Sequence, residues 1–125
     1  MRLEEVMTKT ANFAGTAYDQ GIRFAPGGIG MPAAAVVNVT AANRSGGNET
    51  YGFTLQESDD GTTWNACGAT ASIDVAGTTA TLGAISVSGF ISKRYVRVSL
   101  AATGATASIT YEAWLNTNVV TNGNP

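Results

Sequence analysis

The stretch "KRYVRVSLAATGATASITYEAWL", residues 93–115, decides the fold of this chain of 125 residues. Within it, apolar and polar side chains alternate twice, over residues 94–100 and again over residues 107–115, and Gly104 stands between the two runs. A period of two is typical of a strand with one face toward a core and the other toward solvent, and glycine favours a turn. The stretch therefore predicts two half-buried strands.

The same alternation occurs in three earlier segments, "AAVVNVTAA" at 34–42, "YGFTLQE" at 51–57 and "ATASIDVA" at 69–76. Five such strands separated by turn signals predict an all-β fold, an antiparallel β-sandwich or barrel. The side chains expected to point inward are Val37, Val39, Ala41, Tyr51, Phe53, Leu55, Ala71, Ile73, Val75, Val96, Val98, Leu100, Ile109, Tyr111, Ala113 and Leu115.

One apolar segment, "ATLGAISV" at 80–87, changes phase in its middle. Ala80 and Leu82 fall on one parity, whereas Ile85 and Val87 fall on the other, with Gly83 between them. A β-bulge or a corner at Gly83 would turn both pairs inward, as where a strand passes from one sheet to another.

The chain divides into three parts. Residues 1–32 show no sustained period of either kind and are expected to form an irregular N-terminal arm and linker. Residues 33–115 are the β-sandwich body. Residues 116–125, "NTNVVTNGNP", are polar and end in turn formers, so we expect a flexible C-terminal tail.

The composition argues against nucleic acid and membrane as partners. Charged residues make up 13% of the chain and the net charge is -2, whereas soluble domains have roughly 25% charged residues. The largest basic cluster is Lys93–Arg94, and nucleic acid requires a basic patch. The uncharged segment between Arg23 and Arg44 is interrupted by "PGGIGMP", and the N-terminus lacks the apolar run of a secretory signal. We expect a soluble protein made in a cytoplasm.

The residue types also limit the chemistry. Histidine is absent, which excludes catalytic triads based on histidine and most zinc or iron sites. Cys67 is the single cysteine, so neither an intramolecular disulfide nor a thiolate cluster can form. We therefore expect no cofactor, no metal and no enzymatic activity.

The densest polar stretch, "LQESDDGTTW" at 55–64, allows three interpretations. As an active site it lacks a second acidic cluster, and the adjacent Asp59 and Asp60 would point to opposite faces of a strand. As a calcium site it lacks alternating acidic positions. As a hairpin turn it is complete, because aspartate accepts bonds from backbone amides, Gly61 tolerates positive φ, and Trp64 begins the next strand.

Residues 59–64 also match the D-x-G-x-T-W part of the Asp-box hairpin of sialidases and other β proteins, although Glu57 stands where that motif prefers Ser or Thr. In those proteins the box is structural and lies away from catalytic residues. We therefore assign Asp59, Asp60, Gly61 and Trp64 to a structural hairpin turn.

Aromatic side chains on the outside of the sandwich would be the next candidates for binding. Parity assigns Tyr95 and Trp114, and with them Trp64, to the outer surface. Exposed aromatic residues on a sandwich favour a protein interface or a loop that covers the sheet over a sugar site. Arg97 lies two positions from Tyr95, so the pair is expected to form part of a surface ladder across neighbouring strands.

Taken in order, the segments resemble the small capsid cement, or decoration, proteins of tailed bacteriophages over roughly residues 12–115. The resemblance rests on an arm containing "AYDQGI", on "AAAVVNVTAA", "FTLQESDDGTTW" and "TATLGAISVSG", and on the stretch at 93–115. It implies a jelly-roll-like sandwich on the outer surface of a virion capsid, made in the host cytoplasm.

That resemblance implies a structural virion protein that binds the major capsid protein and stabilises contacts between its subunits, with self-contact on the shell or a homo-oligomer. The charged arm is expected to face the shell and to become ordered on assembly. The candidate contact residues are Arg2, Glu4, Glu5, Lys9, Arg23, Tyr95, Arg97 and Trp114. The alternatives are a carbohydrate-binding or adhesive module of a phage fibre or tail and, more remotely, a hydrolase with a carboxylate pair.

Overall fold

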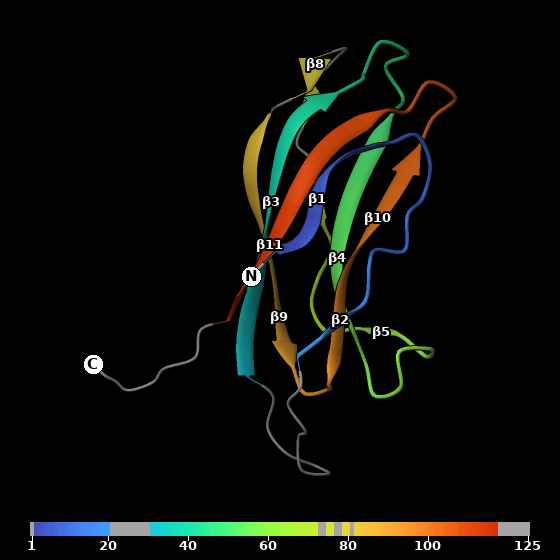
Figure 1. Ribbon diagram of the computed structural model, residues 1–125. Helices are drawn as coiled ribbons and strands as arrows, with labels where there is room; N and C mark the ends of the chain where they lie inside the picture. Colours follow the sequence, from blue (N-terminus) through green and yellow to red (C-terminus); the bar gives the residue numbers. More distant parts are fainter. Residues whose placement is uncertain (1, 21–30, 73–74, 77–78, 81, 118–125) are drawn as a thin grey trace, which may run out of the picture.

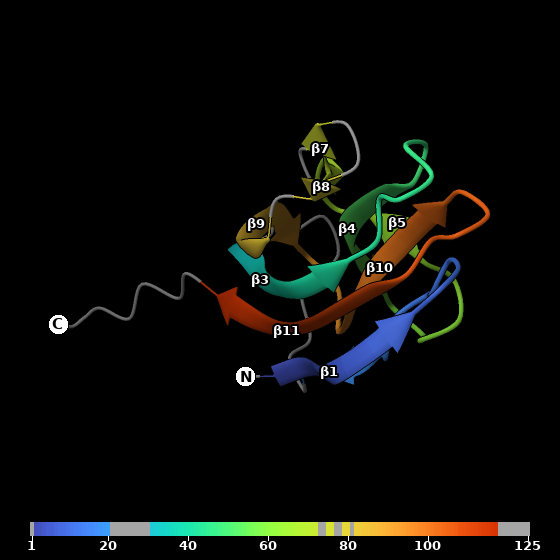
Figure 2. The same ribbon diagram turned by 90° about the horizontal axis from the view of Figure 1, so that it is seen from above.

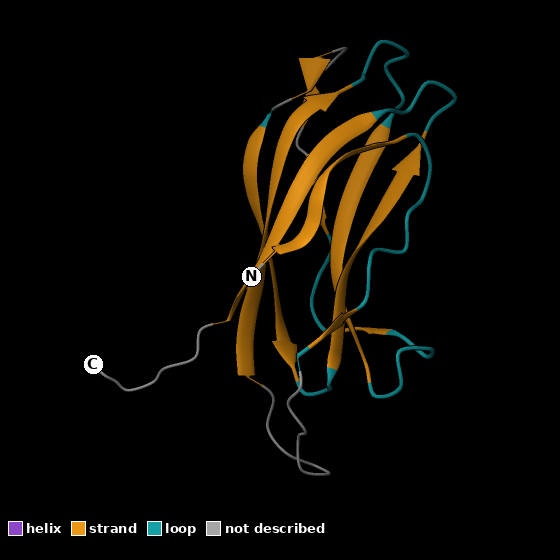
Figure 3. Ribbon diagram, viewed as in Figure 1, coloured by secondary structure: helices purple, strands orange, loops and turns teal. Residues whose placement is uncertain are grey.

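The computed structural model describes residues 2–20, 31–72, 75–76, 79–80 and 82–117, and this part of the chain contains strands and no helix (Figure 3). It accordingly has no helix that could span a membrane. Two antiparallel sheets pack face to face, as the view from above shows (Figure 2). The predicted all-β antiparallel sandwich is confirmed.

The long strands are divided between the two sheets (Figure 1). The first sheet has the order β1 (Arg2–Lys9), β11 (Ile109–Thr117), β3 (Met31–Ala42) and β9 (Gly83–Ile91). The second has the order β2 (Tyr18–Asp19), β10 (Tyr95–Thr103), β4 (Thr50–Ser58) and β5 (Asn65–Ala66), with β6 (Ala71–Ser72) also paired to β4. Strands β7 (Val75–Ala76) and β8 (Thr79–Ala80) pair with each other.

The long strands β3, β4, β9, β10 and β11 lie alternately in the two sheets. Each connection therefore crosses the sandwich, which is how a jelly roll is built, although a full jelly roll has eight strands. The two strands of the stretch at 93–115 consequently belong to opposite sheets. Their inward faces meet across the core.

The core lies between the inner faces of the sheets and follows the alternation in the sequence. Phe53 of β4 and Tyr111 of β11 meet edge to face across it, with ring centroids 5.0 Å apart. The predicted inward residues found buried are Val37, Val39, Tyr51, Phe53, Leu55, Val96, Val98, Leu100, Ile109, Tyr111, Ala113 and Leu115. Ala71 is half-buried against this core, and the side chains predicted at positions 73 and 75 lie outside the described part.

Two inward assignments are wrong, one because a strand pair contains an irregularity and the other because the residue precedes its strand. A register shift in the β3–β11 pair, opposite Thr110 and Tyr111, turns Ala41 outward and brings Ala42 against the core. At the phase change, Gly83 has a φ of +123° and begins β9, so Val87 points inward while Leu82 remains 51% exposed. A bulge inserts one residue into a strand, so every later side chain moves to the opposite face. The alternation in the sequence does not reveal where such an insertion occurs.

The N-terminal segment departs from the predicted irregular arm. Residues 2–9 form β1, an edge strand paired with β11, and Leu3 is buried. The pairing contains two irregularities, around Glu4, so that Leu3 and Glu4 are both buried, which erases the period of two in the sequence. This part of the predicted arm is integral to the sandwich.

The chain then crosses to the second sheet and follows the edge of β10. Phe13 and Leu100 exchange two backbone hydrogen bonds of 3.0 and 2.8 Å, and β2 pairs with the start of β10. Gly15 allows the close approach, since a Cβ atom there would lie 2.1 Å from the Val98 carbonyl oxygen. At the other end of the chain, β11 continues to Thr117, two residues into the predicted tail.

The opposite side of the sandwich is closed through a single residue. The Cys67 amide donates to the Leu55 carbonyl of β4, and the Cys67 carbonyl accepts from the Phe90 amide of β9, both at 3.0 Å. A Cβ atom on Gly68 would lie 1.9 Å from the Ser88 carbonyl oxygen, so only glycine fits there. Residue 67 thus joins the two sheets by their backbones.

The close packing of the N-terminal segment on β10 predicts a large effect of Gly15→Ala. The new methyl group meets a backbone oxygen and φ is +92°, so we expect the free energy of unfolding to fall by about 2 to 4 kcal/mol. Gly47→Ala is the matched control, because Gly47 has a φ of +75° and open space around it; it should lose only about 1 to 2 kcal/mol. Equal losses in urea unfolding would contradict this packing.

Candidate functional site

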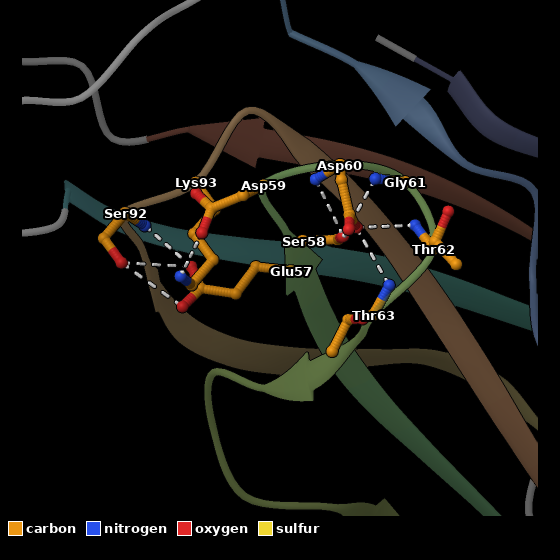
Figure 4. A network of polar contacts seen from close by, with 9 residues as sticks. All are labelled: Glu57, Ser58, Asp59, Asp60, Gly61, Thr62, Thr63, Ser92 and Lys93. Atoms are coloured by element: carbon orange, nitrogen blue, oxygen red, sulfur yellow. Dashed lines mark hydrogen bonds and ion pairs between the residues drawn. The ribbon is translucent and has the colours of Figure 1, made fainter.

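The turn after β4 is held by the carboxylate of Asp60 (Figure 4). Its Oδ1 accepts hydrogen bonds from the amides of Thr62 and Thr63, at 2.8 and 2.9 Å, and from the Ser58 hydroxyl at 2.9 Å. The Ser58 Oγ in turn accepts from the Gly61 amide at 2.9 Å, and Gly61 has a φ of +77°. The two threonine amides, followed by the Ser58 hydroxyl, lower the pKa of Asp60 to about 2.

Asp59 makes a different contact, to the turn between β9 and β10. The Lys93 Nζ donates to the Asp59 Oδ2 at 2.8 Å, and this hydrogen bond raises the pKa of Lys93. Next to it, the buried Glu57 accepts from the Ser92 amide at 2.7 Å and from the Ser92 hydroxyl (Figure 4). The two turns are therefore fixed to each other by adjacent carboxylates.

Sequence reasoning missed the role of Glu57, which it treated as a departure from the Asp-box pattern. The signal was present, since Glu57 continues the inward parity of Phe53 and Leu55 along β4. Trp64 closes the hairpin, with its indole Nε1 donating to the Gly61 carbonyl at 3.3 Å. The stretch at 55–64 thus has the geometry of a turn with its carboxylates engaged by its own chain.

The hollow beside this hairpin is too small for a substrate. It has a volume of about 90 Å³ and is lined by Asp59, Asp60, Thr63, Asn65 and Lys93, whereas ligand pockets in proteins measure roughly 300 to 1,000 Å³. In the described ranges no group of three or more acidic, cysteine or histidine residues is placed to hold a metal ion. The hairpin offers neither a cleft nor a ligand set.

A second polar network, also missed from the sequence, lies at the opposite end of the sandwich. Glu49 is fully buried, and its Oε2 accepts from the Gly46 amide at 3.1 Å and from the Thr106 hydroxyl. The Thr106 bond is the main cause that lowers the pKa of Glu49. The Tyr51 hydroxyl donates to the Asn43 carbonyl at 2.6 Å, which fixes the same loop to β4. These contacts again join one loop of the chain to another.

The predicted contact residues of the N-terminal segment are dispersed. Glu4 is buried and accepts from the amide and the hydroxyl of Thr16, at 2.7 and 2.9 Å, so it presents nothing to a partner. Its charge adds to the effect of burial in raising the pKa of Tyr111. Glu5 is exposed on β1. Lys9 lies over the Phe13 ring, 3.9 Å from its centroid, and the predicted contact at Arg23 lies outside the described residues.

Trp114 and Arg2 lie on the outer face of the first sheet. The Arg2 guanidinium lies 5.1 Å from the centroid of the Trp114 ring and 3.9 Å from the Glu112 carboxylate. Tyr95 and Arg97 are instead on the outer face of the second sheet, on alternate positions of β10. The predicted contact residues therefore occupy both outer faces and are not gathered in one cluster.

The second sheet carries two arginine–aromatic pairs, one on the outer face of β10 and one at its start. The Arg97 guanidinium lies 4.2 Å from the centroid of the Trp64 ring, and its Nε donates to the Gln56 side chain at 2.7 Å. Arg94 lies 5.3 Å from the centroid of the Tyr95 ring and makes two 2.7 Å hydrogen bonds to the Asp19 carboxylate. We call Trp64, Arg94, Tyr95 and Arg97 the arginine–aromatic face.

Cation–π contacts are a general feature of the surface. The rings with a Lys or Arg over one face are Phe13, Trp64, Tyr95 and Trp114. Phe90 differs, since its side chain is 61% exposed and no cation of the described chain lies over its ring. A sugar ring stacks on an open aromatic face. In each of these four rings the cation occupies one of the two faces, so only the other is open for stacking.

Phe90 lines a groove on the surface of the sandwich. This groove has a volume of about 520 Å³ and is lined by small, neutral residues, among them Pro32, Ala34, Cys67, Gly68 and Ser88. Cys67 is its one titratable side chain. Burial, followed by the nearby Glu57 charge, raises the pKa of the Cys67 thiol to about 12, so the thiol is protonated and a poor nucleophile.

Comparison with known proteins gives no assignment: no protein-family model matches the chain, and no curated protein matches it.

The bonds to Asp60 predict a pH dependence of stability. The pKa of Asp60 in the folded protein, about 2, is below the ordinary value of 3.8, so its contribution is complete above about pH 4 and is lost as the pH falls through 2. Asp60→Asn keeps an oxygen acceptor but cannot titrate. The variant should have a lower melting temperature at pH 7 and a smaller loss between pH 4 and pH 2 than the wild type. Asp59→Asn is the control and should retain the loss; an unchanged pH profile in Asp60→Asn would contradict this role.

The raised pKa of Cys67 predicts slow alkylation in the folded protein. Iodoacetamide at pH 8 should modify Cys67 at least about a hundredfold more slowly in the native protein than in urea, because a thiolate is the reacting species. Intact mass measured over time reports both rates. Similar rates under the two conditions would show that this thiol is accessible and ionised.

Proposed function

We propose that this chain is a structural virion protein, a decoration subunit that binds the outer surface of a phage capsid and stabilises contacts between major capsid protein subunits. The resemblance over residues 12–115 supports it, and so does the sandwich fold that the resemblance implies. A protein that reinforces a shell needs a rigid body and a contact surface, because the shell repeats each contact many times.

The observation that carries the proposal is the arginine–aromatic face. Trp, Tyr and Arg are the residue types that dominate binding energy in protein interfaces. Here Arg97 is held by Gln56 and Trp64, and Arg94 by Asp19, so these side chains lose little conformational freedom on binding. We assign the shell contact to this face.

The N-terminal segment is not part of the proposed contact. It would have to leave the sandwich in order to wrap a neighbouring subunit, and Leu3 and Glu4 are buried within that sandwich. Removing residues 1–24 would take away an edge strand of the first sheet together with the cover of β10. The N-terminal segment contributes instead to the rigidity of the sandwich.

The proposal is tested by mixing the purified protein with expanded shells that lack it and measuring the bound fraction after sedimentation. Wild-type protein should bind at a copy number near one per shell subunit, and Arg97→Ala should weaken binding at least about tenfold. Arg2→Ala is the matched control, because Arg2 makes the same kind of contact with Trp114 on the opposite sheet; it should bind like the wild type.

Two results would contradict the proposal. Failure of the wild type to bind such shells, together with only a few copies in purified virions, would exclude a decoration role. Binding to a glycan array that is lost in Tyr95→Ala would favour the carbohydrate-binding or adhesive module of a fibre or tail.

A further inference from the structure

Phe90 is the most exposed large apolar side chain of the described chain, at 61%. It lies on β9, opposite Pro32 of β3 at the end of the first sheet. Leaving an aromatic ring of this size in water is unfavourable, because its apolar surface stays hydrated. A single exposed apolar residue is ordinary, but this one stands at the rim of the groove.

The groove is shaped by residues that have little or no side chain. Gly68 lies against the backbone of Ser88, and Gly89 lies against that of Cys67, where a Cβ atom would be 2.7 Å from the Cys67 carbonyl oxygen. Ala34 and Ser88 are paired across β3 and β9 and add only small groups. A large projecting ring and a hollow lined by small residues therefore lie side by side on one surface.

We propose that this surface joins two copies of the chain through a twofold axis, with Phe90 of each copy inserted into the groove of the other. A twofold interface requires that one patch contain both a projecting group and the hollow that receives it. Phe90 and the groove meet that requirement within a few residues of β9.

The charge of the surface matches a second copy. None of the described residues that line the groove is charged, so two copies of a chain with a net charge of -2 can meet there without like charges in contact. A strongly acidic or basic partner would find no oppositely charged group in the groove. The groove is complementary to a neutral, apolar surface, and Phe90 of a second copy provides such a surface.

Association by strand addition is hindered at β1, at the Phe90 position of β9 and along β10, which favours contact through side chains. The edge strand β1 contains two irregularities that interrupt its line of backbone groups. Along β9, the Phe90 amide is already bonded to Cys67. The edge of β10 is covered by Phe13 and β2.

The inference does not rest on the proposed function, since two copies can associate without a shell. It is also compatible with it. The arginine–aromatic face belongs to the second sheet, whereas Phe90 and Ala34 belong to the first, so a subunit bound by one surface keeps the other free. Pairs of copies could then reinforce each other on a shell.

Sedimentation equilibrium of the intact purified protein, from micromolar concentrations to about 1 mM, tests the inference. The wild type should form a dimer in a concentration-dependent manner. Phe90→Asp removes the projecting ring, and Ser88→Arg fills the groove; each should weaken dimerisation at least about thirtyfold. Both positions are exposed, so the variants should fold, as circular dichroism can verify.

The matched controls are Val6→Asp and Leu82→Asp, because these are the other exposed large apolar residues in the described part of the chain, at 58% and 51%. They should dimerise like the wild type. Three results would overturn the inference: a wild type that remains monomeric up to about 1 mM, a folded Phe90→Asp that dimerises as well as the wild type, or a trimer or larger ring in place of the dimer.

Discussion

Backbone hydrogen bonds along the two open sides of the sandwich are the constraint on which the rest of the structure depends. On one side Phe13 pairs with Leu100, and on the other Cys67 accepts from one sheet and donates to the other. Each contact requires a glycine beside it, Gly15 in the first case and Gly68 in the second, because a Cβ atom would meet a backbone oxygen. A sheet with open edges invites pairing with other chains, and here β2 and Phe13 occupy the edge of β10, Cys67 occupies the Phe90 position of β9, and the pairing of β1 is irregular.

This closure determines how the protein can meet a partner. Because strand addition is hindered along these edges, we expect contact through side chains on the two outer faces, and these differ. The second sheet presents arginine and aromatic side chains held by Gln56 and Asp19. The first sheet presents Phe90 beside a neutral groove. Such a body suits a subunit that touches a shell on one side and a neighbour on the other, with modest contacts repeated many times.

The alternation in the sequence was sufficient to predict the strands whose pairing is regular. Val96, Val98 and Leu100 are buried as their spacing indicates, because a strand with one face in a core exposes every second side chain. It failed where an extra residue enters a strand. The bulged β1 places Leu3 and Glu4 both inward, and no period survives such an insertion.

The polar contacts were harder to predict, because they depend on which strands become neighbours. Parity alone placed Tyr95 and Trp114 outside, but the pairing of Arg97 with Gln56 follows from the register of β10 on β4. Glu57 had the parity of an inward residue, yet a buried carboxylate is rare unless it is paired, and its partner, Ser92, is 35 residues away. Asp59 and Asp60, adjacent in sequence, serve two separate contacts for the same reason.

The most direct test of the proposed division between the two faces is a cryo-electron microscopy map of expanded shells saturated with the purified protein. The map should place β10 and β4 against the shell, with Arg97 and Trp64 at the contact, and should place Phe90 away from the shell, free or against a second copy. A map in which the first sheet faces the shell, or in which the saturated shells carry no added density, would contradict it.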